Sequence, residues 1–582
     1  MALFNSLRAA SSVAAIAAGL MAVSVPAYAD MESLLEKLRD KGILSEDEFN
    51  EMRQDVREAR REAAMDKVNK ANSAKTELKG VWKDGFGFTT GDGQHSIKLT
   101  GRVQTDYRWG DSGDKYQSVT GHDVDTSSSA DGFELRRARF GVQGFMYKDI
   151  NYKAEWNLVG GAPVVDEAYA NFAFYKPIQL TMGRFKQPFS LEQLTSSNST
   201  DFAERSYVDQ NGVPAKKLGA MLSGEPIKGI TYAASVFQEG FNEVTASDGN
   251  GKRYAGRLTA NLAELGKIKD TVLHFGGAYV GGSYQLQPTQ STQSNDGPES
   301  VTRATLVGFR TMNRGLSNIY RVQVGGVPVC GGSTASTGST ATAACYRSGV
   351  PSAYALDAES ELKGLETALA YGPLKLQGEY SWNNTSAVDP LNPTSFAGGE
   401  VKSFYVQSVW NVTGEKWADM YSGGVFKGVK PHNNFKPGSG WGAVQLALRF
   451  SQYDAKDMKI AGSNTTTVQG TREQSGYYAE SGKGFGVTGC TDTGEYKGCL
   501  PSNQNARVES YGIGLNWILN PNTKFMFEYT RTDFGGETAQ LDIKAGVAGA
   551  TTVGATSTGT NTGRGQGVTS ENLFSIRGQF NF

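Results

Sequence analysis

The residues best suited to chemistry in this chain are arginines, and they occur in two settings. Arg102, Arg136 and Arg137 lie on predicted strands, the last two in the stretch ELRRARFGVQG. Others lie in a long loop, residues 281–360. Between 301 and 350 this loop carries no acidic residue and five arginines: Arg303, Arg310, Arg314, Arg321 and Arg347. Guanidinium groups offer paired donors and stay charged, so they suit oxyanions. The pattern predicts anion binding rather than a reaction.

The same arginines also have a purely structural interpretation. A long loop often folds outward, where its arginines would only be solvated. If the predicted strands close into a barrel, arginines inside it commonly pair with carboxylates such as Asp106 or Glu155. Arginines paired in this way select no solute. Strict alternation along ELRRARFGVQG places Arg137 and Arg139 on one face and Arg136 on the other, unless Arg136 lies at a strand end or a bulge.

A second charged stretch follows directly on an apolar strand, in TMGRFKQPFSLEQLTSSNSTDFAERS, residues 181–206. It begins like a membrane-facing strand and becomes a polar loop with charged side chains. These are Arg184, Lys186, Glu192, Glu204 and Arg205. An apolar wall joined to a cluster of charges is the arrangement that a channel needs.

No pattern favours catalysis, a metal or a cofactor. The four histidines, His95, His122, His274 and His432, are widely scattered, and no serine, histidine and aspartate constellation stands out. The four cysteines form two local pairs with no histidine nearby: Cys330 and Cys345, and Cys490 and Cys499. In an exported protein such pairs predict two loop disulfides.

Residues 1–29 have the pattern of a secretory signal peptide. Arg8 supplies the positive charge, residues 9–25 are largely apolar, and Ala27-Tyr28-Ala29 is a cleavage site. Without this segment the chain has 57 basic and 59 acidic residues, because Arg8 is the only charge removed from the 58 and 59 of the whole. The net charge of −2 argues against nucleic acid as a partner. No later apolar run reaches the length of about 20 residues that a membrane helix needs.

Residues 30–79 are charged, nearly free of glycine and helical in pattern. Ser45 and Glu48 form a capping box. An apolar seam follows at spacings of three and four, as in a coiled coil: Phe49, Met52, Val56, Ala59 and Ala63. Two interpretations stay open, association between subunits and packing on the same chain.

Residues 80–582 predict an all-β fold, a transmembrane antiparallel β-barrel of about 16 strands. From Ser96 to Tyr107, for example, apolar and polar residues alternate, and similar alternation recurs to the end of the chain. Short turns and long loops also alternate, which is typical of barrels with periplasmic turns and extracellular loops. One join breaks this rule, because residues 413–440 fall on the short-turn side and are long. A barrel of this size is wide enough for an aqueous channel.

The order of motifs resembles the polyphosphate/phosphate-selective porin family (porins O and P). GRFKQPFSLEQLTSSNSTDFAERS is similar to the family's segment GRF…F.LE..TSS…ER, LRRARFGVQG to its RRA strand and VVDEAYANF to its DEA strand. The stretch from WNVTGEKW to GWGAVQLALRFSQYD resembles its LTGE…KP…GAWEL region, and GIGLNWILNPNTKFMFEYTR its penultimate hairpin. Together these matches cover most of residues 81–582.

The resemblance implies a trimeric, 16-stranded outer-membrane porin with an anion pathway. Its central site would match Arg102, Arg136, Arg137, Asp166 and Arg205, with Glu192 in the matching segment. Its arginine ladder, on an inward-folding fifth loop, would consist of Arg303, Arg310, Arg314 and Arg321. Three lysines of the phosphate-specific members are absent, since Gln193, Asn198 and Asn151 stand in their places. Their loss predicts a weaker site for a doubly charged oxyanion.

The sequence therefore predicts passive diffusion of small hydrophilic solutes, preferentially anions such as phosphate or polyphosphate, across the outer membrane of a Gram-negative bacterium. Expected partners are outer-membrane lipid, small anions and two further copies in a homotrimer. The periplasmic helical segment 30–79 would contact peptidoglycan or another envelope component, or help to hold the trimer. The alternatives are a general or weakly cation-tolerant porin, and a barrel that serves mainly as an envelope tether.

Overall fold

The protein forms two compact units, Met1–Val81 with Phe88–Ser96 and Trp82–Gly87 with Ile97–Phe582. The computed structural model describes residues 27–82, 85–111, 116–117, 123–124, 131–240, 250–286, 289–291, 299–314, 320–324, 328–330, 356–389, 392–455, 457–461, 507–538 and 568–582. The predicted signal peptide lies mostly outside these residues, so its cleavage stays a prediction.

The described residues of the first unit form two helices, α2 (Ala27–Asp40) and α3 (Glu46–Thr76). The predicted capping box at the start of α3 is confirmed, because the Ser45 hydroxyl accepts the N–H of Glu48 and the Glu48 carboxylate accepts the N–H of Ser45. The seam residues Phe49, Met52 and Val56 are buried with Leu35 of α2. This part of the seam therefore packs on the same chain. No helix among the described residues has the length and apolar character needed to span a bilayer.

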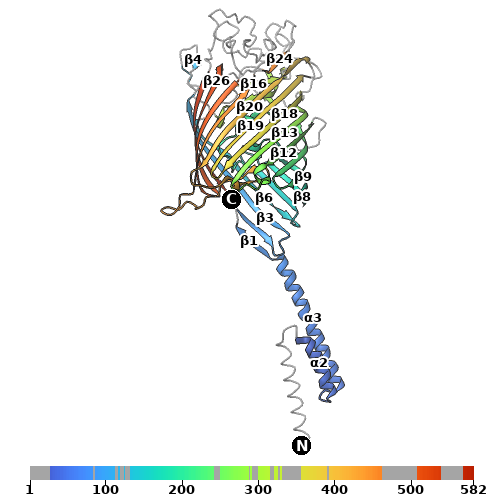
Figure 1. The fold of residues 1–582 in the computed structure, drawn as a ribbon. Coiled ribbons are helices and arrows are strands. Elements are labelled where there is room, and N and C mark those ends of the chain that lie inside the picture. The colour runs from blue at the N-terminus through green and yellow to red at the C-terminus, as the bar shows by residue number, and fades with distance from the viewer. Residues whose placement is uncertain are drawn as a thin grey trace, which may run out of the picture. The chain divides into compact units, whose positions relative to one another are not determined.

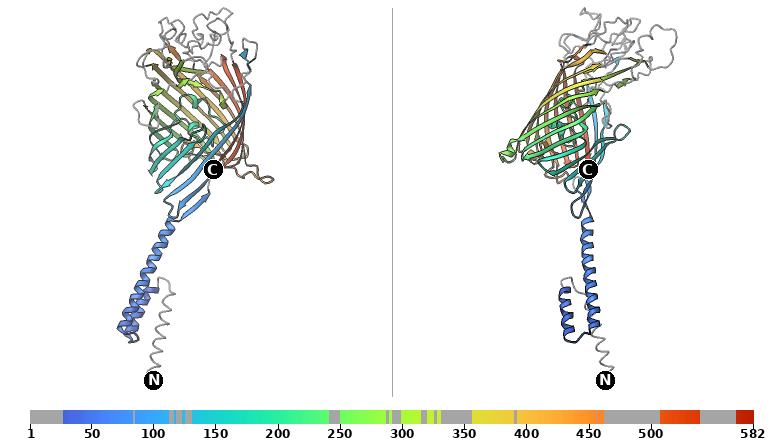
Figure 2. Two further views of the ribbon diagram at one scale, coloured as in Figure 1. Left: turned by 180° about the vertical axis from the view of Figure 1, so that it is seen from behind. Right: turned by 90° about the vertical axis from the view of Figure 1, so that its right-hand side faces the viewer.

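The second unit is a closed antiparallel barrel of 16 strands, which Figures 1 and 2 show from three sides. Its strands are β3 (Ser96–Asp111), β6 (Gly132–Met146), β7 (Ile150–Asn157), β8 (Val164–Tyr175), β9 (Ile178–Lys186), β10 (Lys216–Ile227), β11 (Ile230–Gly240), β12 (Asn250–Asn261), β13 (Thr271–Leu286), β18 (Leu356–Tyr371), β19 (Leu374–Asp389), β20 (Asn392–Asn411), β23 (Ala443–Asp454), β25 (Arg507–Asn520), β26 (Thr523–Thr538) and β27 (Val568–Asn581). The last strand closes the wall by pairing with β3, from Asn572 opposite Asp111 to Asn581 opposite Arg102.

Further elements lie before and between these strands. They are β1 (Leu78–Trp82), β2 (Phe86–Thr90), β4 (Tyr116–Gln117), β5 (Asp123–Val124), α4 (Leu191–Leu194), α5 (Tyr207–Gln210), α6 (Leu262–Leu265), β14 (Thr289–Ser291), β15 (Glu299–Phe309), η1 (Met312–Arg314), β16 (Tyr320–Val324), β17 (Pro328–Cys330), η3 (Trp417–Met420), β21 (Tyr421–Ser422), β22 (Val425–Phe426) and β24 (Lys459–Ala461).

The predicted alternation of faces along the strands is confirmed. On β3 the side chains of Arg102, Gln104 and Asp106 are buried inside the barrel, whereas Val103 and Tyr107 are 44% and 37% exposed on the outside. Strands β23 and β25 alternate in the same way. Apolar residues outside and polar residues inside are the pattern of a wall that meets lipid and encloses water.

Two segments fold back into the barrel and narrow it. The first is residues 187–215, here called the inner loop, which joins β9 to β10. The second is the first half of residues 412–442, the long join that broke the expected rule. Trp417 and Phe426 of this join pack in one buried cluster with Leu191 and Phe202 of the inner loop. The join is long because it builds an apolar core inside the barrel, against the inner loop.

Candidate functional site

The inner loop is fixed to the wall at the start of its first helical turn. The Ser190 hydroxyl caps α4 by accepting the N–H of Gln193 at 3.1 Å. The carboxylate of Glu379 on β19 accepts the N–H groups of Leu191 and Glu192 at 3.1 and 2.7 Å. A carboxylate at free N–H groups of a helical turn is favourable for both charge and hydrogen bonding. The loop therefore starts from a defined position in the lumen.

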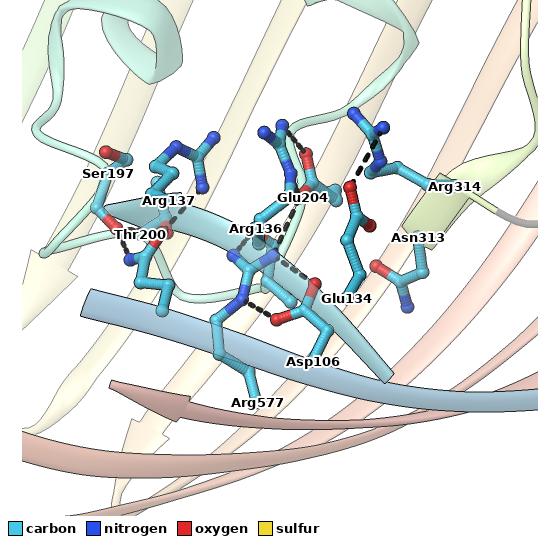
Figure 3. Close-up of polar contacts among 12 residues, drawn as sticks. Asp106, Glu134, Arg136, Arg137, Ser197, Thr200, Glu204, Asn313, Arg314 and Arg577 are labelled. Carbon is cyan, nitrogen blue, oxygen red and sulfur yellow. Dashed lines mark hydrogen bonds and ion pairs between the residues drawn. The ribbon is translucent and has the colours of Figure 1, made fainter. Parts of the chain in front are cut away.

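The centre of the inner loop is held by a group of ion pairs, here called the paired network. Figure 3 shows its core, where the Arg577 guanidinium of β27 binds both oxygens of Asp106 at 2.6 and 2.7 Å. The same guanidinium donates to Glu204 of the inner loop at 2.7 Å. Arg136 binds Glu204 with two hydrogen bonds of 2.6 and 2.9 Å. Further members are Arg108, Glu134 and Arg314.

Glu204 stays ionised in this position because two arginines surround it. Burial alone would raise the pKa of Glu204, but the charges of Arg577 and Arg136 outweigh burial and hold that pKa well below its ordinary value of 4.5. The charges of Arg136, Arg577, Asp106 and Glu204 therefore largely cancel one another.

Arg136 and Arg137 are neighbours in sequence and both point into the barrel. Phe133 and Leu135 are 81% and 49% exposed on the outside, so Arg136 falls inside by alternation. Arg137 is also buried, and it donates to Gln104 of β3 at 2.7 Å. The alternation of faces thus shifts by one residue between the two arginines. The sequence left room for an irregular position that would keep Arg136 off the lipid face. Strand β6 has such a position.

A second set of cations, here called the unpaired basic group, consists of Arg102, Arg137, Lys186 and Arg205. Arg102 donates to the Ser197 hydroxyl at 2.5 Å, and Gln104 links Ser197 to Arg137 through its side-chain amide. Within the described residues neither arginine forms an ion pair. The Nε of Arg102 is buried and has no hydrogen-bond partner among them.

Lys186 and Arg205 form the other half of the unpaired basic group. Lys186 donates to the carbonyl oxygens of Gln193, Leu194 and Thr195 at 2.6 to 3.1 Å. The Arg205 guanidinium donates to the carbonyl oxygens of Glu192, Gln193 and Thr195. The end of α4 thus holds both cations by its carbonyl dipoles. No carboxylate in the described part of the chain pairs with either cation.

A closed barrel whose lumen holds an inward loop and unpaired cations is the geometry of a diffusion channel. The family model described as phosphate-selective porin O and P matches residues 97–307 and 348–547. The chain belongs to this family. It is an outer-membrane porin, and therefore a channel of a Gram-negative outer membrane rather than an enzyme.

Individual proteins with similarity to this chain include one relative and two solved structures. The porin is 24% identical over 464 residues to Porin O of Pseudomonas aeruginosa, covering 77% of this chain and 85% of that protein. Among solved structures it is similar to the trimer form of OmpT of Vibrio cholerae, with 10% identity, a TM-score of 0.40 and coverage of 84% and 99% of the two chains. The channel DcaP of Acinetobacter baumannii gives 9% identity, a TM-score of 0.37 and coverage of 84% and 97%.

Asp166, which the resemblance places in the central site, is engaged in this porin. It pairs with Arg139 at 2.7 Å and with Lys216. Neighbouring wall residues extend this cluster, namely Lys153, Glu155 and Glu167. Asp166 therefore lies among cations of the wall, and its charge is shared with two of them.

The predicted arginine ladder is only partly described. The backbone N–H and C=O of Arg310 both bond to the Gln210 side chain of α5, and Arg314 pairs with Glu134 at 3.2 Å. This part of the fifth long loop therefore reaches the lumen. The side chains of Arg303 on β15 and Arg321 on β16 lie outside the described residues. The same holds for the side chain of Cys330 and for Cys345, Cys490 and Cys499, so both disulfides stay predictions.

Sequence reasoning missed three residues of this site as members. Arg577 anchors the paired network, yet it lies near the end of the last strand, 373 positions from Glu204. Lys375 of β19, which pairs with Asp201 of the inner loop at 2.7 Å and lies over the Trp417 ring, was also missed. Lys186 was noted only as a charge in the opening of the loop. Alternation gives one signal for Arg577, since it places this arginine on the inward face opposite Phe574 and Phe580.

Proposed function

We propose that this porin prefers anions, and that oxyanions such as phosphate cross its constriction at the unpaired basic group. The observation that supports this proposal is the absence of ion pairs at Arg102, Arg137, Lys186 and Arg205 within the described residues. Charges that carboxylates neutralise exert little field on a passing solute. Four uncompensated cations beside one narrow loop attract anions and repel cations over several ångströms.

The chemistry of the group suits an oxyanion in particular. Two of its members are guanidinium groups on neighbouring strands, Arg102 on β3 and Arg137 on β6, linked through Gln104. The Nε of Arg102 retains a donor without a partner among the described residues. Guanidinium forks bind phosphate oxygens with paired hydrogen bonds, whereas chloride has one centre and uses only one donor at a time. Transient binding followed by release is what permits selective conduction.

The second candidate is a general porin, and a specific observation favours it. The cluster at Asp166 includes the carboxylates Glu155 and Glu167, both buried in the lumen wall. The positions of three family lysines are held by Gln193, Asn198 and Asn151. A pathway past these groups would carry a more balanced charge and would select weakly.

The deciding experiment is the reversal potential of the purified porin in a planar bilayer under a KCl gradient, followed by addition of phosphate. A reversal potential whose sign indicates chloride permeation, together with block by phosphate at low concentration, supports the oxyanion pathway. A weak or cationic potential without block would leave the general porin. For substitutions in the unpaired basic group, the matched control is Arg531→Gln. This exposed arginine is paired with Asp533 on the outer face of the barrel and does not face the lumen.

Two further parts of the prediction concern assembly and the helices. We infer a homotrimer from family membership, to be tested by mass measurement of the purified porin in detergent.

An envelope contact through residues 30–79 is tested by deleting them. Unchanged conductance with loss of envelope integrity would assign the tether role to the helices, and unchanged integrity would remove it.

A further inference from the structure

The second half of the long join leaves the barrel interior and lies on its outer face. Val429 is still buried. Phe435 then packs edge to face on Trp517 at 5.1 Å, and its N–H bonds to the carbonyl of Leu519. Trp517 shares the outward face of β25 with Ile513 and Leu515, which are exposed. Residues 427–441, here called the rim segment, therefore run from the mouth of the barrel to the lipid-facing side of β25, near its turn-side edge.

The rim segment has a defined backbone rather than a loose one. A tight turn closes between Lys436 and Gly440 through hydrogen bonds of 3.0 and 3.1 Å between their backbones. Gly438 lies in the left-handed region at φ +80°, which glycine adopts at little cost. The Trp517 indole donates to the carbonyl of Trp441 at 2.8 Å. These contacts fix the segment to the end of β25.

The exposed residues of the rim segment are aromatic, basic or neutral, and none of them is acidic. Trp441 is 78% exposed. Lys427, Lys430 and Lys436 are exposed as well. No acidic residue occurs between positions 420 and 453. Glu415, whose carboxylate accepts the N–H of His432 at 3.2 Å, is buried.

Tryptophan and lysine together on an outward-facing rim match the boundary between hydrocarbon and headgroups. Tryptophan favours this level of a bilayer, and lysine reaches from it toward phosphate. The short-turn end of an outer-membrane barrel faces the periplasm, so the nearest headgroups belong to the inner, phospholipid leaflet. Basic residues near such a surface attract anionic lipids.

We propose that the rim segment is a binding surface for anionic phospholipid headgroups of the periplasmic leaflet. Trp441 and Phe435 set the depth of the segment in the bilayer, and Lys427 and Lys436 bind the lipid phosphates. Within the described residues neither Lys427 nor Lys436 forms an ion pair that would compete. This surface lies outside the lumen, and its role is independent of which ions the channel conducts.

The test measures contact between Trp441 and lipid in the full-length porin. The protein is reconstituted into phosphatidylcholine bilayers that contain a fixed fraction of either brominated phosphatidylglycerol or brominated phosphatidylcholine. The difference in fluorescence quenching between the unaltered porin and Trp441→Phe is the quenching of Trp441 by the brominated lipid. We expect brominated phosphatidylglycerol to associate at this tryptophan about fivefold or more over phosphatidylcholine, since one lysine near a surface contributes about that factor.

Two variants separate the lysines from general charge. Replacing Lys427, Lys430 and Lys436 by glutamine should abolish the preference. The matched control replaces three exposed lysines on the same end of the barrel, Lys176, Lys269 and Lys416, and should keep it. High salt should abolish the preference in the unaltered protein, which tests the proposal even where a variant fails to fold.

Three results would overturn the proposal. Equal quenching by both lipids would reduce the segment to an apolar anchor. An undiminished preference in the first triple variant would place the lipid contact elsewhere. Absence of quenching by either lipid would show that Trp441 faces another copy of the chain, a cell-wall polymer or water.

Discussion

Arg136 and Arg137 are adjacent, inward-facing and identical in type, yet they belong to regions with opposite electrostatic roles. Arg136 pairs with the Glu204 carboxylate in the paired network, whereas Arg137 donates to the neutral amide of Gln104 and has no carboxylate partner among the described residues. The first region holds the inner loop in place, and the second leaves positive charge in the lumen. The difference teaches that lumenal arginines must be judged by their partners before selectivity is assigned to them.

The inner loop contributes a different kind of group to each region, a carboxylate to one and carbonyl oxygens to the other. Its carboxylate at Glu204 enters the paired network, while its carbonyl oxygens near Thr195 hold Lys186 and Arg205. Carbonyl dipoles orient a cation without removing its charge, but a carboxylate cancels it. One loop of about thirty residues can therefore be rigid and electropositive at once.

The largest effect is expected from removing the anchor of the paired network by Arg577→Gln. Asp106 would lose its bidentate partner and Glu204 one of its two, inside a buried site, at a cost of about 3–5 kcal/mol in the free energy of unfolding. The urea midpoint of the folded barrel in detergent should fall clearly. Arg531→Gln, at an exposed pair, should cost about 1 kcal/mol or less. Equal losses in both variants would contradict the anchoring role.

A smaller effect on stability, but a large one on selectivity, is expected from Arg137→Gln. No carboxylate loses a partner, so the cost should stay near about 1 kcal/mol, that of one hydrogen bond. The chloride-to-potassium permeability ratio from the reversal potential should fall severalfold. Arg136→Gln should in contrast destabilise the fold as well. A ratio unchanged by Arg137→Gln would remove this arginine from the pathway.

A gain is expected from Asn198→Lys, which restores a lysine where the phosphate-specific relatives carry one. The added charge lies on the inner loop beside Ser197, the partner of Arg102. An added cation in a pore is worth on the order of 1 kcal/mol, so phosphate block should tighten about fivefold. Asn198→Gln is the neutral control. Equal block in both variants would separate phosphate binding from this part of the loop.

The smallest effect is expected from pH in the neutral range. The pKa of Glu204 lies below its ordinary value of 4.5, so the stabilisation from this carboxylate is complete above about that pH and is lost as pH falls further, through the depressed pKa. The stabilisation from Glu204 should therefore stay constant between about pH 8 and pH 5 and fall only in stronger acid, as the urea midpoint of the folded barrel would report. A transition near neutrality would show that another group controls the loop.

Much of this architecture was readable from local patterns. The faces of β3, the helix start at Ser45 and the alternation of short turns with long loops follow from residues a few positions apart. The position of Arg136 was harder, because one irregular step in a strand reverses the face of every residue before it. The role of the 412–442 join could not be predicted, since its apolar residues pack on the inner loop and not on their own neighbours.

The sequence by itself determined a barrel wall, its polar interior and the presence of arginines in it, because period-two alternation and side-chain charge are properties of single strands. Only the tertiary structure decided which arginines have their charge offset by a carboxylate partner and which do not. Arg577 and Glu204 are 373 positions apart and meet inside the closed barrel, while Arg137 donates to Gln104 and forms no ion pair with any described residue. Pairing depends on distance in space, and closure of the wall around the inner loop sets that distance.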